Sequence, residues 1–293
     1  MIRETGVKHR SGNKCVQGQM YSMKPGNRPF IELRLQDTEV YQGLLVLVNR
    51  DHPVRHQEQQ TEKLPGYILR SMHAEEPDIS LERTCLHQLA ALIDACEATD
   101  KITVVSGYRS SRKQRQIYES TLASHGEAFT ASYVALPGAS EHQTGLAVDV
   151  GLLDRELDYI RPSFSGEGAS GVFRDLAPVY GFIQRYQEGK EEVTGIACEP
   201  WHYRYVGYPH AAIMEQRGLC LEEYTGYVKD FPWGIRHLCY EDGERVYEIY
   251  YVKATGEETD VPIVTGGSAE WSGNNQDGYI ITVSRTDRNQ EQA

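Results

Sequence analysis

Two short segments of the sequence combine the residue types that hold a metal ion. The first carries His142 and Asp149 on either side of Gly145, and the second carries His202. A catalytic zinc site takes three protein ligands and leaves one position for water. His142, Asp149 and His202 are therefore a candidate set of two histidines and one carboxylate. Gly145 would let the chain turn so that the first two side chains converge.

A carboxylate close to the second histidine could supply acid–base chemistry. Glu199 precedes His202 by three residues, and Pro200 breaks the regular path between them. Glu199 could therefore act as a general base on water at the metal without being a ligand itself. Zinc brings the pKa of its water to about 7, so a carboxylate could take that proton near neutral pH.

Each of these residues also has a simpler interpretation when it is taken alone. A single histidine is more often exposed, or hydrogen-bonded in the core, than bound to a metal. Asp149 could accept hydrogen bonds at the end of a strand, and Glu199 could be an ordinary surface charge. The residues alone leave both the metal site and these structural roles open.

The elements around these segments are expected to be helices and short strands. Apolar residues over 81–96 recur at spacings of three and four, which predicts a helix with Ser80 as its N-cap. Alternation over 146–150 predicts a strand with Asp149 on the face opposite the apolar side chains. Further helices are expected at 111–124, 173–180 and 209–218, and further strands at 43–48, 101–105, 181–186 and 201–206.

The sequence pattern divides the chain into three parts. We expect a lead-in at 1–40 with a short alternating piece, a central domain at 41–225, and a small all-β appendage at 226–293. The appendage has 6 basic and 12 acidic residues, and it lacks helical periodicity. Its strand-like runs, which Gly, Asn and Asp turns separate, lie at 235–240, 244–252, 260–264 and 279–284.

Composition excludes several classes of protein. The 293 residues include 30 Lys and Arg against 42 Asp and Glu, a formal net charge of −12. A nucleic-acid binder needs a basic surface, and so does a protein that docks on anionic lipid, so neither class fits. The longest apolar run, 44–48, is too short to span a bilayer, and the first 14 residues do not resemble a signal peptide.

Cysteine and tyrosine usage adds two expectations. The six cysteines contain no CxxC pair, so buried free thiols are expected rather than disulfides; they are Cys15, Cys85, Cys96, Cys198, Cys220 and Cys239. The 19 tyrosines, against 6 phenylalanines, gather around the junction of the central domain and the appendage. Since a tyrosine can bury its ring and keep its hydroxyl bonded, this predicts a contact between the two.

The motifs together resemble a known family. Ser140-Glu-His-Gln-Thr-Gly-Leu-Ala-Val-Asp149, followed by Glu199-Pro-Trp-His202, is similar to the zinc D-alanyl-D-alanine carboxypeptidases of the VanY type. The similarity covers more than half of the chain, in the same order. It includes Leu47-Val-Asn-Arg-Asp-His-Pro53, Ser106-Gly-Tyr-Arg-Ser110, Tyr180-Gly-Phe-Ile-Gln-Arg-Tyr186 and Leu221-Glu-Glu-Tyr224.

The resemblance implies a fold and a ligand set. It implies an α+β zinc domain, with helices packed on a small antiparallel sheet, as in the D-Ala-D-Ala dipeptidases and the amino-terminal signalling domain of hedgehog proteins. It implies that His142, Asp149 and His202 bind zinc and that Glu199 is the catalytic base. Cys198, next to Glu199, is expected to pack rather than to bind the metal.

The resemblance also implies substrate contacts. Arg109 would face the active site and stabilise the developing oxyanion, although a structural salt bridge is the alternative. Gln114 and Ser140 would hydrogen-bond the peptide or its terminal carboxylate, but Ser140 could also be only a turn residue. Trp201 would form part of the pocket wall, unless it is simply part of the core.

The function that we expect is hydrolysis of the terminal D-Ala-D-Ala bond of peptidoglycan stem pentapeptides, with release of D-alanine. The alternatives are an L,D-carboxypeptidase acting on tetrapeptide stems and a bifunctional D,D-dipeptidase/carboxypeptidase. From another class, the chain could be a zinc-stabilised module that binds cell wall or a protein without catalysis. An extracytoplasmic location is expected, with a cytoplasmic one as the alternative, and the appendage could mediate self-association.

Overall fold

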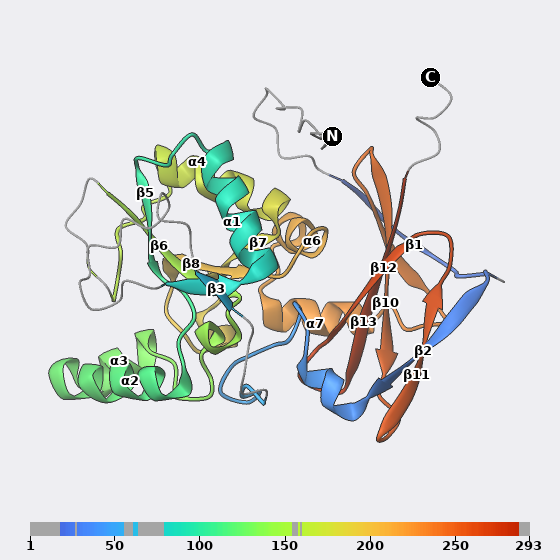
Figure 1. The fold of residues 1–293 in the computed structure, drawn as a ribbon, viewed down its shortest axis with the longest axis horizontal. Helices are drawn as coiled ribbons and strands as arrows, with labels where there is room; N and C mark the ends of the chain where they lie inside the picture. Colours follow the sequence, from blue (N-terminus) through green and yellow to red (C-terminus); the bar gives the residue numbers. More distant parts are fainter. Residues whose placement is uncertain are drawn as a thin grey trace, which may run out of the picture.

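The computed structural model describes residues 18–26, 28–55, 61–63, 79–153, 158 and 160–286. Figure 1 shows a lobe of mixed helices and strands and a lobe of strands, with helix α7 (Leu221–Lys229) between them. The fold class is α+β, as predicted. Within the described ranges, every helix is too short or too polar to cross a membrane.

The mixed lobe is organised around a four-stranded antiparallel sheet. Helix α1 (Arg83–Ala95) packs on one face of this sheet. It shares a core there with alternate residues of strand β6 (Ala147–Leu152), among them Val148 and Val150. Asp149 therefore lies on the opposite face, as the alternation predicts. The strands run in the order β5 (Ile102–Ser106), β6 (Ala147–Leu152), β8 (Glu199–Tyr205) and β7 (Phe182–Tyr186).

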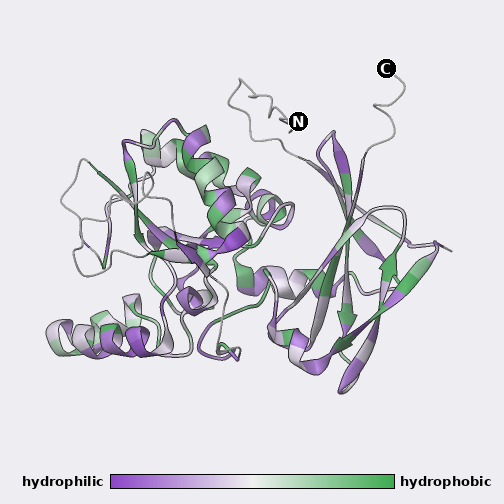
Figure 2. Cartoon of the chain, in the orientation of Figure 1, coloured by the Kyte–Doolittle hydropathy of each residue, from purple (hydrophilic) through white to green (hydrophobic). Residues whose placement is uncertain are grey.

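Helix α1 forms where the apolar periodicity predicts it, but its cap is different. The buried positions Cys85, Leu89 and Leu92 lie on one face, and Figure 2 shows apolar and polar positions mixed along the helix. The predicted N-cap, Ser80, lies instead in strand β4 (Ser80–Glu82). Glu82 takes the capping role because its carboxylate accepts a 2.9 Å hydrogen bond from the Cys85 N–H.

The predicted strand at 43–48 is wrong. Residues 45–48 are buried, but the segment pairs with no strand of the described residues, because its backbone bonds to side chains and loops of other elements. Arg204 donates to the carbonyls of Leu44 and Val46, and the Leu45 N–H donates to the Ser272 hydroxyl. An apolar run is compatible with a buried strand and with a buried loop, and here the loop is the observed form.

The predicted helix at 173–180 consists of two elements. Helix α4 (Ala169–Leu176) starts earlier, and a 3₁₀ turn, η3 (Ala177–Tyr180), follows it because Pro178 cannot continue the α-helical hydrogen bonds. The remaining elements of this lobe are α2 (Ser111–His125), α3 (Glu127–Tyr133), η2 (Glu141–Thr144), α5 (Glu191–Thr194), α6 (His210–Arg217) and strand β3 (Thr61–Lys63), which pairs with β4.

The second lobe contains the predicted appendage strands together with two from the N-terminal part. The first of these, β1 (Gln19–Met23), pairs with β9 (His237–Glu241), and the second, β2 (Phe30–Gln36), pairs with β11 (Glu258–Val264). Part of the expected lead-in therefore supplies strands to the sheets of the tail. The sheet order is β1 (Gln19–Met23), β9 (His237–Glu241), β10 (Arg245–Lys253), β13 (Gly278–Thr286) and β12 (Ser268–Gly273). The ribbon beside it is β2 (Phe30–Gln36) with β11 (Glu258–Val264), and η1 (Asp37–Tyr41) follows β2.

The two lobes share a hydrophobic core, and tyrosines form part of it as predicted. The ring of Tyr208 packs edge-on against Tyr240 and Tyr247 from the second lobe, with centroids 6.0 and 5.4 Å apart. His210 on α6 contacts the Thr282 hydroxyl of β13 at 2.9 Å. Helix α7 contributes Tyr224 and Val228 to the same core, so the lobes are packed together and not merely linked.

The five cysteines in the described residues are free thiols, as predicted. Cys198 is half-buried, whereas the other four are buried, including Cys85 and Cys96 on α1. Cys15 lies outside the described residues.

Candidate metal centre

Strand register brings Asp149 and His202 together. The two residues are direct partners on the antiparallel strands β6 and β8, so their side chains project from the same face of the sheet. Their neighbours Val148 and Tyr203, also partners, point into the core on the other face. The pairing of two central strands therefore fixes two of the three predicted ligands.

His142 reaches the same point from the short turn η2. Gly145 ends this turn in the left-handed conformation, with φ of 71°, which returns the chain into β6 and Asp149. The His142 Nδ1 lies 2.7 Å from the carbonyl oxygen of Gly107. A hydrogen bond from Nδ1–H to this carbonyl leaves the Nε2 lone pair directed at Asp149.

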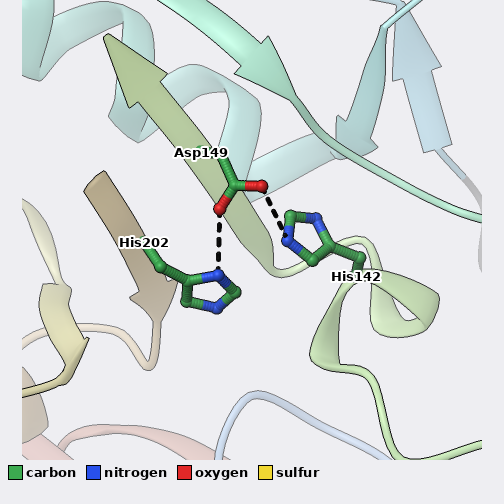
Figure 3. Close-up of side chains that lie close together, drawn as sticks. All are labelled: His142, Asp149 and His202. Carbon is green, nitrogen blue, oxygen red and sulfur yellow. Dashed lines mark ion pairs between the residues drawn. The ribbon is translucent and has the colours of Figure 1, made fainter. Parts of the chain in front are cut away.

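The three side chains converge on one point in the way a metal ion requires. His142 Nε2 lies 3.2 Å from one Asp149 oxygen, and His202 Nδ1 lies 2.9 Å from the other (Figure 3). One candidate ligand atom from each side chain lies within 4.8 Å of the others. Among the residues that the structure describes, His142 Nε2 and Asp149 Oδ1 are buried without a hydrogen-bond partner, which suits a cation between them.

The electrostatics of the cluster reflect its crowding. Burial and the nearby Arg109 lower the pKa of His142 to about 4. Burial also disfavours charge on His202, but the carboxylates of Asp149 and Glu141 outweigh it and raise its pKa to about 9. Despite burial, the two histidines hold the pKa of Asp149 well below its usual range. Asp149 is therefore ionised, as a metal ligand must be.

An irregularity in the sheet aims Glu199 at this cluster. Residues three apart on a regular strand face opposite sides, yet Glu199 Oε2 lies 3.6 Å from His202 Nδ1. The β7–β8 register shifts between Gln184 and Tyr186, beside Pro200, and this shift turns Glu199 toward the metal ligands. Burial, with a smaller contribution from Asp149, raises the pKa of Glu199 to about 8.

Arg109 also faces the cluster, from the exit of strand β5. Its guanidinium donates to Asp149 Oδ2 and to Gln114 Oε1, both at 3.1 Å. The Gln114 amide in turn donates to the carbonyl of Ala135 at 2.8 Å, which fixes its orientation. Arg109 Nε is buried and has no partner among the described residues, and the side chain as a whole lines the cavity beside the cluster.

The cluster lies in the wall of a cavity of about 280 Å³. All the predicted site residues line this cavity. Ser140 and Trp201 line it, and Trp201 is also part of the core, so both interpretations of that residue hold. A second cavity of about 380 Å³ adjoins the first. The two share four lining residues, Val134, Ala135, Tyr186 and Ile196.

Three residues of the site have no role in the sequence-based prediction. Tyr186 packs its ring on His202, with centroids 5.0 Å apart, and Lys113 is a second cationic side chain in the cavity wall. Glu141, adjacent to His142, is fully buried between two arginines. The position of Glu141 next to a predicted ligand could have indicated a role in the site. Its partners Arg185 and Arg204 are distant in sequence, so the pairing itself could not be predicted. Cys198 accepts a weak hydrogen bond from Gln184 and is not in the ligand group, as expected.

Comparison with known proteins gives the same assignment. The family profile of VanY, D-alanyl-D-alanine carboxypeptidase, matches residues 78–208. The bifunctional D-Ala-D-Ala dipeptidase and D-Ala-D-Ala carboxypeptidase VanXYC of Enterococcus gallinarum is 40% identical over 185 residues, which is 63% of this chain and 94% of the relative.

Two solved structures are also similar. The vancomycin resistance D,D-dipeptidase VanXYg, in complex with a D-Ala-D-Ala phosphinate analogue, is 40% identical and superposes with a TM-score of 0.80 over 92% of this chain and 100% of its own. A mutant of the D,D-pentapeptidase VanY from the VanB-type resistance cassette, in complex with Zn(II), is 33% identical, with a TM-score of 0.50 over 62% of this chain and 98% of its own. With the His142, Asp149 and His202 cluster, these matches show that the chain belongs to the VanY family of zinc D-alanyl-D-alanine carboxypeptidases.

Proposed function

We propose that this chain hydrolyses the terminal D-Ala-D-Ala bond of peptidoglycan stem pentapeptides and releases D-alanine. The observation that carries the proposal is the convergence of three ligands, a buried carboxylate and a guanidinium on one cavity. His142, Asp149 and His202 would hold zinc, which when bound polarises the scissile carbonyl and acidifies water.

Glu199 is the acid–base group in this arrangement. It lies beside His202 in the cavity wall but outside the ligand set, as a proton acceptor for attacking water must. After the attack, the same carboxyl would return the proton to the leaving amine of D-alanine. The carboxylate is buried, which limits exchange of its proton with bulk solvent.

Arg109 supplies positive charge where an oxyanion would develop. Two of its nitrogens are held by Asp149 and Gln114, so the guanidinium is fixed before substrate arrives. The same guanidinium lines the cavity, where its positive charge can stabilise the carbonyl oxygen as that atom gains negative charge. Gln114 and Ser140 line the same cavity and would contact the peptide or its terminal carboxylate, with Lys113 as the second cation there.

The size of the site favours a peptide over a free dipeptide as the main substrate. The second cavity, between α3 and α5, continues from the first and offers room for residues on the acyl side of the scissile bond. A pentapeptide would fill both cavities, whereas D-Ala-D-Ala would fill only one. Extra binding energy from the acyl side can be used to orient the reacting bond.

A second candidate function is hydrolysis of the free dipeptide D-Ala-D-Ala in addition. It is favoured by the similarity to the Enterococcus gallinarum relative, whose name describes both activities. An L,D-carboxypeptidase would use the same zinc chemistry and differ in the shape of the pocket. A module that binds without catalysis is disfavoured, because it has no need of Glu199 in contact with the ligand set.

The experiment is a comparison of three substrates with the zinc-loaded protein. D-alanine release is measured from a stem pentapeptide ending in D-Ala-D-Ala, from the tetrapeptide with an L,D bond, and from free D-Ala-D-Ala. We expect the highest kcat/KM for the pentapeptide. A higher value for the tetrapeptide or for the free dipeptide would overturn the substrate assignment, and turnover of none of them would favour the binding module.

A further inference from the structure

Glu141 forms the centre of a buried chain of charges behind the metal ligands. Its side chain is fully buried, and its Oε1 accepts from Arg185 Nε at 2.8 Å and from Arg204 at 2.9 Å. An unpaired carboxylate at this depth would be strongly unfavourable, but two guanidinium groups compensate its charge. The two arginines outweigh the effect of burial and keep the pKa of Glu141 below its usual value.

The second oxygen of Glu141 faces His202. Glu141 Oε2 and His202 Nε2 lie 3.7 Å apart, and both are buried atoms without a hydrogen-bond partner in the described part of the chain. One is an acceptor and the other can be a donor, so the two unpaired atoms complement each other. A small side-chain adjustment would close a hydrogen bond between them, and no other described residue bonds to either atom.

The opposite side of the same imidazole faces the other ligands. His202 Nδ1 lies 2.9 Å from Asp149 Oδ1, on the side where the three ligand side chains converge. Only the nitrogen without a proton can bind a metal, so the proton must reside on Nε2. A carboxylate behind a ligating histidine favours this arrangement, orients the ring and makes its free nitrogen a stronger ligand.

We propose that Glu141 is a positioning residue, which holds His202 with Nε2–H toward its own carboxylate and Nδ1 toward the metal. This rests on the metal site of the proposed function but not on the identity of the substrate. Arg185 and Arg204 fix the carboxylate that performs this role. They are themselves anchored outside the site.

The anchors explain why Glu141 cannot easily move. Arg185 makes a two-pronged contact with Glu222 on α7, at 2.8 and 2.6 Å. Arg204 donates to the carbonyls of Leu44 and Val46 in the buried loop. The orientation of one metal ligand thus depends on contacts that extend to α7, the helix between the two lobes.

The test compares Glu141→Gln with Glu222→Gln. In Glu141→Gln, the amide oxygen stays with the two arginines, since the alternative would turn the NH₂ group toward them. The NH₂ group then faces His202 Nε2, where it opposes a proton on that nitrogen. Glu222→Gln is the matched control. It removes a negative charge that pairs with Arg185, in the same chain of buried charges, but Glu222 is not in contact with His202.

Two readouts are taken without substrate, so they are independent of the proposed reaction. Competition with a chromophoric chelator gives the zinc Kd, and NMR of the zinc-loaded, ¹⁵N-histidine-labelled protein detects the His202 Nε2–H. We expect a zinc Kd about 10- to 100-fold weaker in Glu141→Gln. We also expect its Nε2–H signal, slowly exchanging and downfield in the parent protein, to move upfield or to exchange away. Glu222→Gln should stay within threefold of the parent Kd and keep the signal.

Two results would overturn the proposal. One is a Glu141→Gln protein with the parent Kd and the parent Nε2–H signal. The other is an equal loss of zinc affinity in Glu222→Gln, which would indicate a general effect of the charge chain. If Glu141→Gln does not fold, the proposal is tested by the zinc Kd of Glu141→Asp and by the Nε2–H signal in the NMR spectrum of the parent protein. Glu141→Asp keeps the charge and should bind zinc more weakly than the parent, and a rapidly exchanging Nε2–H in the parent protein would refute the hydrogen bond.

Discussion

The positions of the Glu199 and His202 side chains depend on a local irregularity in strand β8. On an unbroken strand they would point to opposite faces, but the register shift beside Pro200 brings them to 3.6 Å. The sequence suggested such a break from the proline alone. The carboxyl group of Glu199 is thereby placed in the cavity wall, while the ligand set remains three side chains.

Replacing Glu199 tests its role directly. Glu199→Gln keeps the shape and removes the proton acceptor, so kcat for D-alanine release should fall by about 10²- to 10⁴-fold. The bound zinc should remain at the parent level, because Glu199 is outside the ligand set. Kinetics with metal analysis checks both. Glu191→Gln, on the exposed side of α5, is the control and should retain parent activity. Loss of zinc in Glu199→Gln would show that the residue is a ligand instead.

At the scale of elements, two central strands and one turn assemble the site. β6 and β8 contribute Asp149 and His202 by register, and η2 contributes His142 through the turn at Gly145. The turn fits tightly against neighbouring backbone, since a Cβ on Gly145 would lie 3.1 Å from the Glu82 nitrogen. The geometry of the turn is therefore part of the geometry of the metal site.

Gly145→Ala should weaken metal binding. The left-handed conformation costs a residue with a Cβ about 1–2 kcal/mol, and relief by movement of η2 would displace His142. We expect a zinc Kd about tenfold weaker, which corresponds to about 1.4 kcal/mol. Gly218→Ala is the control, with a similar φ of 62° and open space around the position. It should lose similar stability and keep the parent zinc Kd; equal zinc affinities in both variants would refute the link.

A substitution on helix α3 tests whether the second cavity binds the acyl side of the substrate. Ala131 lines it, so Ala131→Trp should obstruct the acyl side and raise KM for the pentapeptide by about tenfold or more, as expected when about 1.4 kcal/mol of binding is lost. Hydrolysis of free D-Ala-D-Ala, which would occupy the first cavity, should change little. Ala128→Trp on the same helix lies outside the cavity lining and controls for the added ring. An unchanged pentapeptide KM in Ala131→Trp would remove the second cavity from the substrate path.

The sequence could predict the elements with strong periodicity and the residues within motifs. It could not predict the loop at 43–48, because burial of an apolar run does not decide whether backbone bonds go to a strand or to side chains. It could not reveal that Glu141 joins Arg185, Arg204 and Glu222, since these partners are separated along the chain and follow no period. The pairing of β1 with β9, from opposite ends of the chain, left no local pattern either.

At the scale of the whole molecule, the lobes are joined through one hydrophobic core and through His210. The His210 ring contacts the Tyr224 hydroxyl at 2.7 Å and the Thr282 hydroxyl at 2.9 Å, deep in that interface. The strand lobe is thus part of the folded unit that holds the catalytic lobe. Self-association through residues 226–293 and an extracytoplasmic location stay predictions, which sedimentation and cell fractionation can test.

The buried His210 should make stability depend on pH. Burial lowers its pKa to about 3, against about 6.5 in the unfolded chain. The unfolded state therefore binds the extra proton first, and the stability is lost as the pH falls from about 6.5 toward 3. His210→Gln should reduce the slope of unfolding free energy against pH in this range by up to about 1.4 kcal/mol per pH unit. Denaturant unfolding at pH 7, 6 and 5 measures it, and parallel slopes for parent and variant would contradict the assignment.

The central claim is that one zinc ion held by His142, Asp149 and His202 enables this chain to release D-alanine from a stem pentapeptide. The most direct measurement is D-alanine release during zinc titration of the chelator-treated protein, with bound metal determined in the same samples. The account predicts activity that rises in proportion to bound zinc and reaches its plateau at one ion per chain. Full activity without metal, or a chain with one bound zinc that releases no D-alanine, would contradict it.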